Sequence, residues 1–375
     1  MKNTRILIIA LFVGFSSQLV NAQQTLLHCG LLIDGMSDRV QKEMTVIIEN
    51  NKIVSIEKGY KKAAPEDEAI DLKNKTVMPG LMDMHVHIES QTSPNKYIEG
   101  FTKNDVDVAY DAAVYAKTTL MAGFTTVRDM GGSGVNTALR DAIKAGKVPG
   151  PRIYSAGKAI GTTGGHADPT NGYRSDLMGD PGPKEGVING PWEARKAVRQ
   201  RYKNGADVIK ITATGGVLSV AKDGSGPQFA MEELKAIVET ANEYGMITAA
   251  HAHGAEGMKR AVEAGITSIE HGTMMTPEVM ELMKNHGTYY VPTISAGKYV
   301  AEKAKIVGYY PALVVPKALE IGPKIQNTFK QAYEAGVKIA FGTDAAVFPH
   351  GENGKEFGYM VEVGMKPMEA IKSAT

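Results

Sequence analysis

The feature that most constrains this chain is an apolar run at residues 78–87, which ends in His85 and His87. Pro79 and Gly80 mark a sharp turn at the start of this run, as expected ahead of a strand. Because side chains alternate faces along a strand, residues two apart point the same way. One strand therefore offers two imidazoles to one metal ion, although the pair alone is also consistent with two incidental histidines.

A second pattern recurs along the rest of the chain, where a helical segment ends at a glycine and a strand begins at once. Glycine just past a helix end adopts the left-handed capping conformation without strain. The six glycines in this position are Gly123, Gly205, Gly245, Gly265, Gly287 and Gly336. Together with the histidine strand and a strand at residues 152–156, the pattern gives eight strands that alternate with helices.

Eight such units in about 300 residues predict an α/β fold, namely a (β/α)8 TIM barrel over residues 78–375. The alternative is an open doubly wound sheet, but no Gly-x-Gly-x-x-Gly turn for a dinucleotide follows the first strand. In a barrel, the functional side chains lie at the carboxyl ends of the strands.

The start of the chain has the pattern of an export signal. Lys2 and Arg5 precede an apolar run at residues 6–15, and small or neutral residues follow, which together predict a secretory signal peptide over residues 1–22. An N-terminal core helix is the alternative. We therefore expect a secreted or periplasmic protein.

Residues 23–77 have the pattern of a small all-β region. Strands are predicted at residues 25–32, 44–56 and 69–72, and Asn51 favours a hairpin within the second of these segments. This region is predicted to be the N-terminal part of a β-sandwich domain.

Composition narrows the class of partner. The formal charge of +1 falls to −1 once Lys2 and Arg5 leave with the signal peptide, so the sequence has no basic footprint for nucleic acid and no polybasic membrane patch. Cys29 is the single cysteine and cannot form an intramolecular disulfide. A small-molecule or dipeptide substrate is the expected partner, and a homo-oligomer is left open.

Five of the eight predicted strands carry, or run into, a side chain that can bind a metal ion. These side chains are His85 and His87 on the first strand, Lys210 on the fourth, His251 on the fifth, His271 after the sixth and Asp344 after the eighth. Nine histidines placed at random would rarely put four at strand ends, so the pattern predicts a metal site.

Lys210 lies inside an apolar strand, where the burial of an ammonium is costly. One interpretation is a snorkelling or salt-bridged lysine. Alternatively, a lysine beside a divalent metal can lose its proton and react with carbon dioxide. The resulting carbamate is an anion with one oxygen for each of two metal ions.

These residues resemble the binuclear metal centre of the amidohydrolase superfamily, over the chain from about Leu26 to its end. The likeness rests on His85-x-His87, Lys210, His251, His271 and Gly342-Thr343-Asp344. The segments at residues 79–87, 250–254 and 269–273 are most similar to one group of this superfamily. That group contains imidazolonepropionase-related hydrolases, prolidase-like Xaa-Pro and Xaa-Arg dipeptidases and ochratoxin-type amidases.

The resemblance implies a role for each of these residues. The more buried of two divalent metal ions would be held by His85, His87 and Asp344. The more exposed ion would be held by His251 and His271, and a carboxylated Lys210 would bridge both ions. Zinc is the expected metal because mixed histidine and carboxylate ligands suit it, with manganese or cobalt as alternatives. Asp344 would also be catalytic, taking the proton of the metal-activated hydroxide and delivering it to the leaving nitrogen.

Two further histidines are predicted to bind substrate. His253 shares a face with His251 and is expected at the rim, where a solvated loop residue is the alternative. His166 lies in a glycine-rich loop over residues 161–190, which is longer than an ordinary connection and is predicted to face the substrate, unless it is a floppy insertion. We expect both side chains to donate hydrogen bonds to a substrate carboxylate.

The sequence therefore predicts a metal-dependent hydrolase that cleaves the C–N amide bond of a dipeptide or N-acyl amino acid by metal-activated hydroxide. The alternatives are hydrolysis of a cyclic amide or imidazolone, or of an ester or lactone, and a metal-binding protein without catalysis. Asp344 favours catalysis, because a binding protein does not need a carboxylate placed as a proton carrier. Members of the family continue beyond the point where this sequence stops, so the last barrel helix and the C-terminal sandwich strands are expected to be incomplete.

Overall fold

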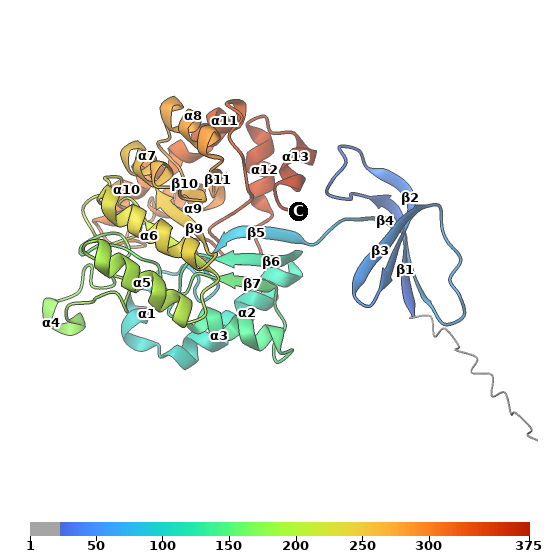
Figure 1. The fold of residues 1–375 in the computed structure, drawn as a ribbon, viewed down its shortest axis with the longest axis horizontal. Helices are drawn as coiled ribbons and strands as arrows, with labels where there is room; N and C mark the ends of the chain where they lie inside the picture. Colours follow the sequence, from blue (N-terminus) through green and yellow to red (C-terminus); the bar gives the residue numbers. More distant parts are fainter. Residues whose placement is uncertain (1–22) are drawn as a thin grey trace, which may run out of the picture. The chain divides into compact units, whose positions relative to one another are not determined.

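The structure is a computed structural model that describes residues 23–375, so the predicted signal peptide at residues 1–22 lies outside the described residues. The chain divides into two compact units, one that ends at Met78 and one that spans Pro79–Thr375. The first is all-β, and the second alternates strands with helices (Figure 1). Within residues 23–375, no helix combines the length and the apolar character needed to cross a membrane.

The smaller unit is a four-stranded sheet with the order β3-β2-β1-β4. Its strands are β1 (Gln24–Leu32), β2 (Gln41–Glu49), β3 (Lys52–Lys58) and β4 (Glu68–Val77). β2 pairs antiparallel with β1 and β3, whereas β4 pairs parallel with β1. The β2–β3 hairpin turns at Asn50 and Asn51, whose φ angles of 49° and 62° suit the tight turn that joins such strands. The predicted β-rich region is therefore present as a single sheet.

The larger unit is a barrel of parallel strands. One sheet contains β5 (Leu81–Val86), β6 (Phe124–Asp129) and β7 (Arg152–Ser155). The other contains β8 (Val208–Thr212), β9 (Ile247–Ala252), β10 (Ser268–His271) and β11 (Tyr289–Val291). The sheets join where the amide of Asp207 donates to the carbonyl of Ser155 at 2.7 Å and where Ile160 pairs with Ile211.

The eighth strand position, at residues 338–345, closes the ring through two isolated pairings. Ile339 pairs with Tyr290 of β11, and Ala345 pairs with Val86 of β5, both in parallel orientation. These pairings join the two sheets on their second side. The (β/α)8 barrel is thereby confirmed and the open sheet is not the fold.

Helices surround the strands of the larger unit (Figure 1). Those before β8 are α1 (Lys96–Thr102), α2 (Asp105–Met121), α3 (Val135–Lys144), α4 (Ser175–Met178) and α5 (Pro191–Lys203). Those that follow are α6 (Met231–Glu243), α7 (Ala255–Glu263), α8 (Pro277–His286), α9 (Ile294–Lys303), α10 (Val314–Ile321), the 3-10 turn η1 (Gly322–Lys324), α11 (Ile325–Glu334), α12 (Lys355–Glu362) and α13 (Pro367–Lys372).

The predicted helix ends are confirmed by the backbone. All six glycines named above have positive φ, between 66° and 95°. Helix α8 shows the full local pattern, because Thr276 accepts a hydrogen bond from the amide of Val279, Pro277 begins the helix and Gly287 ends it. Local sequence thus sets where each helix stops and the next strand begins.

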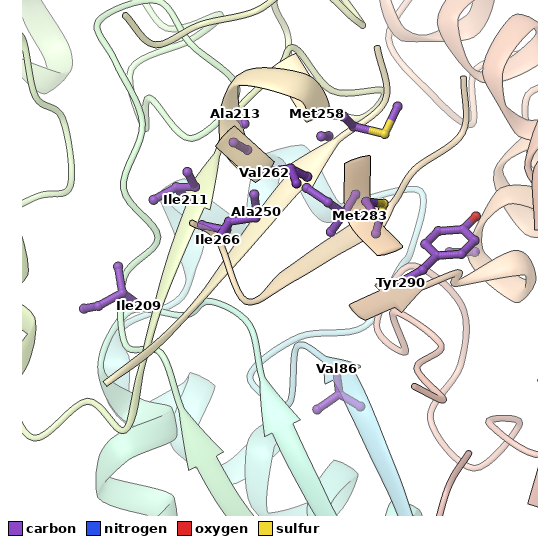
Figure 2. Packing of buried hydrophobic residues seen from close by; sticks show 14 of the residues in the cluster. Val86, Ile209, Ile211, Ala213, Ala250, Met258, Val262, Ile266, Met283 and Tyr290 are labelled. Atoms are coloured by element: carbon purple, nitrogen blue, oxygen red, sulfur yellow. The ribbon is translucent and has the colours of Figure 1, made fainter. Parts of the chain in front are cut away.

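Alternation along the strands sorts side chains between the outer core and the barrel interior. Ile209 and Ile211 of β8 are fully buried in one apolar cluster with Met258 and Val262 of α7 (Figure 2). Burial of each such side chain contributes about 1.5–3 kcal/mol. Lys210, between the two isoleucines, lines the interior cavity instead. The packing of the helices therefore fixes the direction in which Lys210 points.

Candidate metal centre

The carboxyl ends of the barrel strands surround one cavity of about 270 Å³. All eight residues predicted to bind metal or substrate line it. They are His85, His87, Lys210, His251, His271, Asp344, His166 and His253. The alternation of strand side chains and the barrel topology together bring these distant positions to one place.

Three of the side chains form a compact ligand set. One ligand atom from each of His85, His271 and Asp344 lies within 4.8 Å of the other two. Oδ1 of Asp344 is 3.5 Å from Nε2 of His85 and 3.5 Å from Nε2 of His87. The resemblance assigns His271 to the more exposed ion and the other two residues to the more buried ion. The ligands of the two expected ions therefore lie next to each other.

Two atoms of this set are buried without a partner. Oδ1 of Asp344 and Nε2 of His85 make no hydrogen bond to any described residue. Buried polar atoms in folded proteins are almost always satisfied. A lone-pair nitrogen and a carboxylate oxygen that face one another are the donor set of a divalent cation, so the residues fit the expected metal.

Each histidine of the centre has one ring nitrogen engaged, which leaves the other for a ligand. The partners are the Glu270 carboxylate for Nδ1 of His85 (2.8 Å), the Gly131 carbonyl for Nδ1 of His87 (2.7 Å), the Thr293 hydroxyl for Nδ1 of His271 (2.7 Å) and the Gly215 carbonyl for Nε2 of His251 (3.0 Å). Such contacts fix the tautomer and the ring orientation. The protein therefore orients these imidazoles before any ion binds.

The backbone is strained at the same place. His271, Thr293 and Asp344 have φ angles of 70°, 53° and 62°. Non-glycine residues in this region cost about 1–3 kcal/mol each and persist where surrounding contacts over-determine them. All three side chains line the cavity, so the strain coincides with the centre.

Glu270 is a site residue that the sequence analysis missed, and Arg128 is its ion-pair partner. Glu270 is fully buried and accepts hydrogen bonds from Nη2 of Arg128 at 2.7 Å and from Oγ of Ser268 at 2.5 Å, in addition to His85. The signal in the sequence was a carboxylate on an otherwise apolar strand, directly before a predicted ligand. Glu270 holds His85 in place, and Arg128 compensates its buried charge.

We expect Glu270→Gln to weaken metal binding about 10- to 100-fold, which is the usual cost of losing such a supporting contact. An amide has one acceptor where the carboxylate has two, so it cannot accept from Arg128 and His85 with separate oxygens. Competition with a chelator measures the affinity. Glu263→Gln, at the exposed end of α7, is the control. Equal affinity in all three proteins would contradict the role given to Glu270.

Burial sets the protonation of the lining groups. It lowers the pKa of His166 and His253 to about 3, because a cation is poorly solvated there. Both imidazoles are therefore neutral near pH 7. Burial also lowers the pKa of Lys210 to about 8, which makes its neutral amine accessible, and raises the pKa of Asp344. A bound divalent cation would act on Asp344 in the opposite direction.

The two predicted substrate contacts, His166 and His253, both pack against the ring of His251 in the cavity. Nδ1 of His253 shares a hydrogen bond of 2.9 Å with the Thr273 hydroxyl, whereas Nδ1 of His166 has no partner among the described residues. The loop over residues 161–190 is anchored near its two ends, where Gly161 pairs with Val187. The apolar residues that line the cavity include Val217, Val300, Ile321 and Ile325.

Comparison with known proteins gives a consistent set of relatives. A model of the Amidohydrolase family matches residues 76–375. Ochratoxinase from Aspergillus niger is 34% identical over 378 residues, which cover 94% of this chain and 75% of that protein. A crystal structure of a Xaa-Pro dipeptidase with bound methionine in the active site is 57% identical with a TM-score of 0.92, covering 94% of this chain and 87% of that one. A prolidase complexed with N-methylphosphonate-L-proline is 31% identical with a TM-score of 0.83, covering 94% and 86%.

Proposed function

The chain belongs to the amidohydrolase family and is a hydrolase of carbon–nitrogen amide bonds, and we propose that it cleaves dipeptides or N-acyl amino acids with two divalent metal ions. The observation that carries this proposal is the pair of unpartnered buried atoms, Nε2 of His85 and Oδ1 of Asp344, within a shell of oriented imidazoles. The 57% identity to a Xaa-Pro dipeptidase supports dipeptides, with Xaa-Pro sequences first.

In the proposed centre, each residue has a defined task. One ion would be held by His85, His87 and Asp344, and the other by His251 and His271. Zinc is the proposed metal. When bound, such ions lower the pKa of water and polarise a carbonyl.

Two residues would complete this chemistry. Lys210 would bridge the ions as its carbamate, which its burial and lowered pKa support. Asp344 would accept the proton of the attacking water and return it to the leaving nitrogen. His166 and His253, which line the same cavity, would contact the substrate. The export pattern in residues 1–22 supports a secreted or periplasmic location for this activity.

The function is tested by a substrate screen with the metal-reconstituted protein. We expect hydrolysis of Xaa-Pro dipeptides, other dipeptides or N-acyl amino acids, detected as release of the free amine. A cyclic amide, an imidazolone-type ring and a lactone serve as comparison substrates. Turnover of only these rings would overturn the proposal in favour of the cyclic alternative, and binding without any turnover would favour the non-catalytic one.

The metal requirement is tested by elemental analysis. After reconstitution with zinc and bicarbonate we expect close to two ions per chain, because the ligand set divides between two sites. His85→Ala should lower this content, since it removes a ligand from the more buried site. His286→Ala, at the exposed end of α8, is the control. A reconstituted wild-type protein without bound metal would refute the centre.

A further inference from the structure

A second cavity of about 400 Å³, here called the side chamber, adjoins the metal centre. It shares His87, Leu218 and Val347 with the main cavity, so the two spaces meet beside a predicted metal ligand. Several residues of its wall carry a hydroxyl group. These hydroxyls belong to Ser90, Thr92, Ser93, Tyr97, Tyr173 and Tyr310.

The side chamber is also lined by an incompletely neutralised cation. Among the described residues that line the two cavities, Lys96 and Lys210 are the only lysines and there is no arginine. Nζ of Lys96 is 3.7 Å from a carboxylate oxygen of Glu99, too far for a hydrogen bond, and Lys103 competes for the same oxygen at 3.5 Å. Partial burial lowers the pKa of Lys96 and Glu99 acts in the opposite direction, while 42% of the lysine side chain is exposed. An anion in the chamber would stabilise this ammonium.

Tyr310 adds a hydroxyl that has no hydrogen-bond partner among the described residues. The residue is 7% exposed, and its Oη atom is fully enclosed. Oγ1 of the neighbouring Thr92 and the hydroxyl of Tyr299 both lie 3.3 Å from the hydroxyl of Tyr309 instead. A buried hydroxyl without a partner is unfavourable, so this one suits a ligand that brings an acceptor.

We propose that the side chamber binds a carboxylate carried by the leaving amino acid, with Lys96 as its counterion and Tyr310 as a hydrogen-bond donor. This inference rests on the proposed function and makes it more specific. It places the leaving residue beside His87 and the acyl part in the apolar cavity. The carboxylate contact expected of His166 and His253 would then fall to Lys96 and Tyr310, which line the side chamber.

The test compares a dipeptide with its C-terminal amide in the metal-reconstituted enzyme. Wild-type protein should prefer the free acid. Lys96→Gln should lower kcat/KM for the acid about 10- to 100-fold and leave the amide unchanged, as expected for one charge-assisted hydrogen bond. Tyr310→Phe should lower the same preference about tenfold. Lys103→Gln is the matched control, since Lys103 contacts the same Glu99 but does not line the chamber.

Two further comparisons make the result decisive. A glutamine-ending dipeptide acid and a glutamate-ending dipeptide amide distinguish an α-carboxylate from a side-chain carboxylate on the leaving residue. Calorimetric titration of the protein with free proline and with prolinamide measures binding without turnover. It therefore tests the chamber even if the substrate screen finds no hydrolysis. The inference is supported if Lys96→Gln binds proline more weakly than the wild-type protein does but binds prolinamide equally well. Equal effects of Lys96→Gln on acid and amide, or no effect on either, overturn it.

Discussion

Asp344→Asn is expected to lower kcat/KM by about 10²- to 10⁴-fold with little change in fold, which is the range that a positioned proton carrier contributes. Asparagine keeps the size of the side chain and one oxygen near His85 and His87. It also tolerates the positive φ of 62° at this position better than most residues. What it lacks is the ability to take and return a proton.

The measurement for Asp344→Asn pairs steady-state kinetics with metal content and thermal unfolding. A variant that keeps its ions and its unfolding temperature but loses turnover isolates the proton-transfer role. Loss of ions in proportion to activity would assign Asp344 to metal binding alone. Activity within tenfold of wild type would show that another group carries the proton.

Lys210→Ala should abolish most activity, on the order of a thousandfold, because alanine removes the anion proposed to bridge the two ions. Lys210 is 4% exposed, so its removal leaves a small enclosed space at the centre. A short-chain carboxylate such as propionate can enter this space and should restore part of the activity and of the metal content.

Lys210→Met is the matched control for this experiment. Its side chain fills the same space without a charge, so added propionate should restore nothing. Activity and metal content are measured across a propionate titration for both variants. Full activity of Lys210→Ala without any addition would show that the lysine serves only in packing.

The sequence was enough to predict that the candidate ligands meet in one cavity, because their placement depends on two regular features. Alternation along a strand fixes which way Lys210 and His251 face, and barrel topology fixes the end at which they meet. The glycine signals worked for the same reason, since helix capping depends on neighbours in the chain.

The contacts that were missed depend on closure of the ring. Arg128 and Glu270 are 142 residues apart and meet across the barrel, which no local pattern reports. The side chamber likewise brings Lys96 and Tyr310 together from distant segments. The irregular end of the eighth strand follows from the positive φ of Asp344 and Ala346, a conformation that sequence periodicity does not reveal.

The closing segment of the barrel also bears on the order of folding. The amide of Asp344 donates to the carbonyl of His85 at 2.7 Å, so the last strand pairs with the first. A contact between residues so far apart in sequence forms late, because the entropy of closing a large loop opposes it. During synthesis His85 and His87 emerge long before Asp344. The complete set of candidate ligands therefore exists only in a finished barrel, and a metal ion bound to it would stabilise the native state over the unfolded chain.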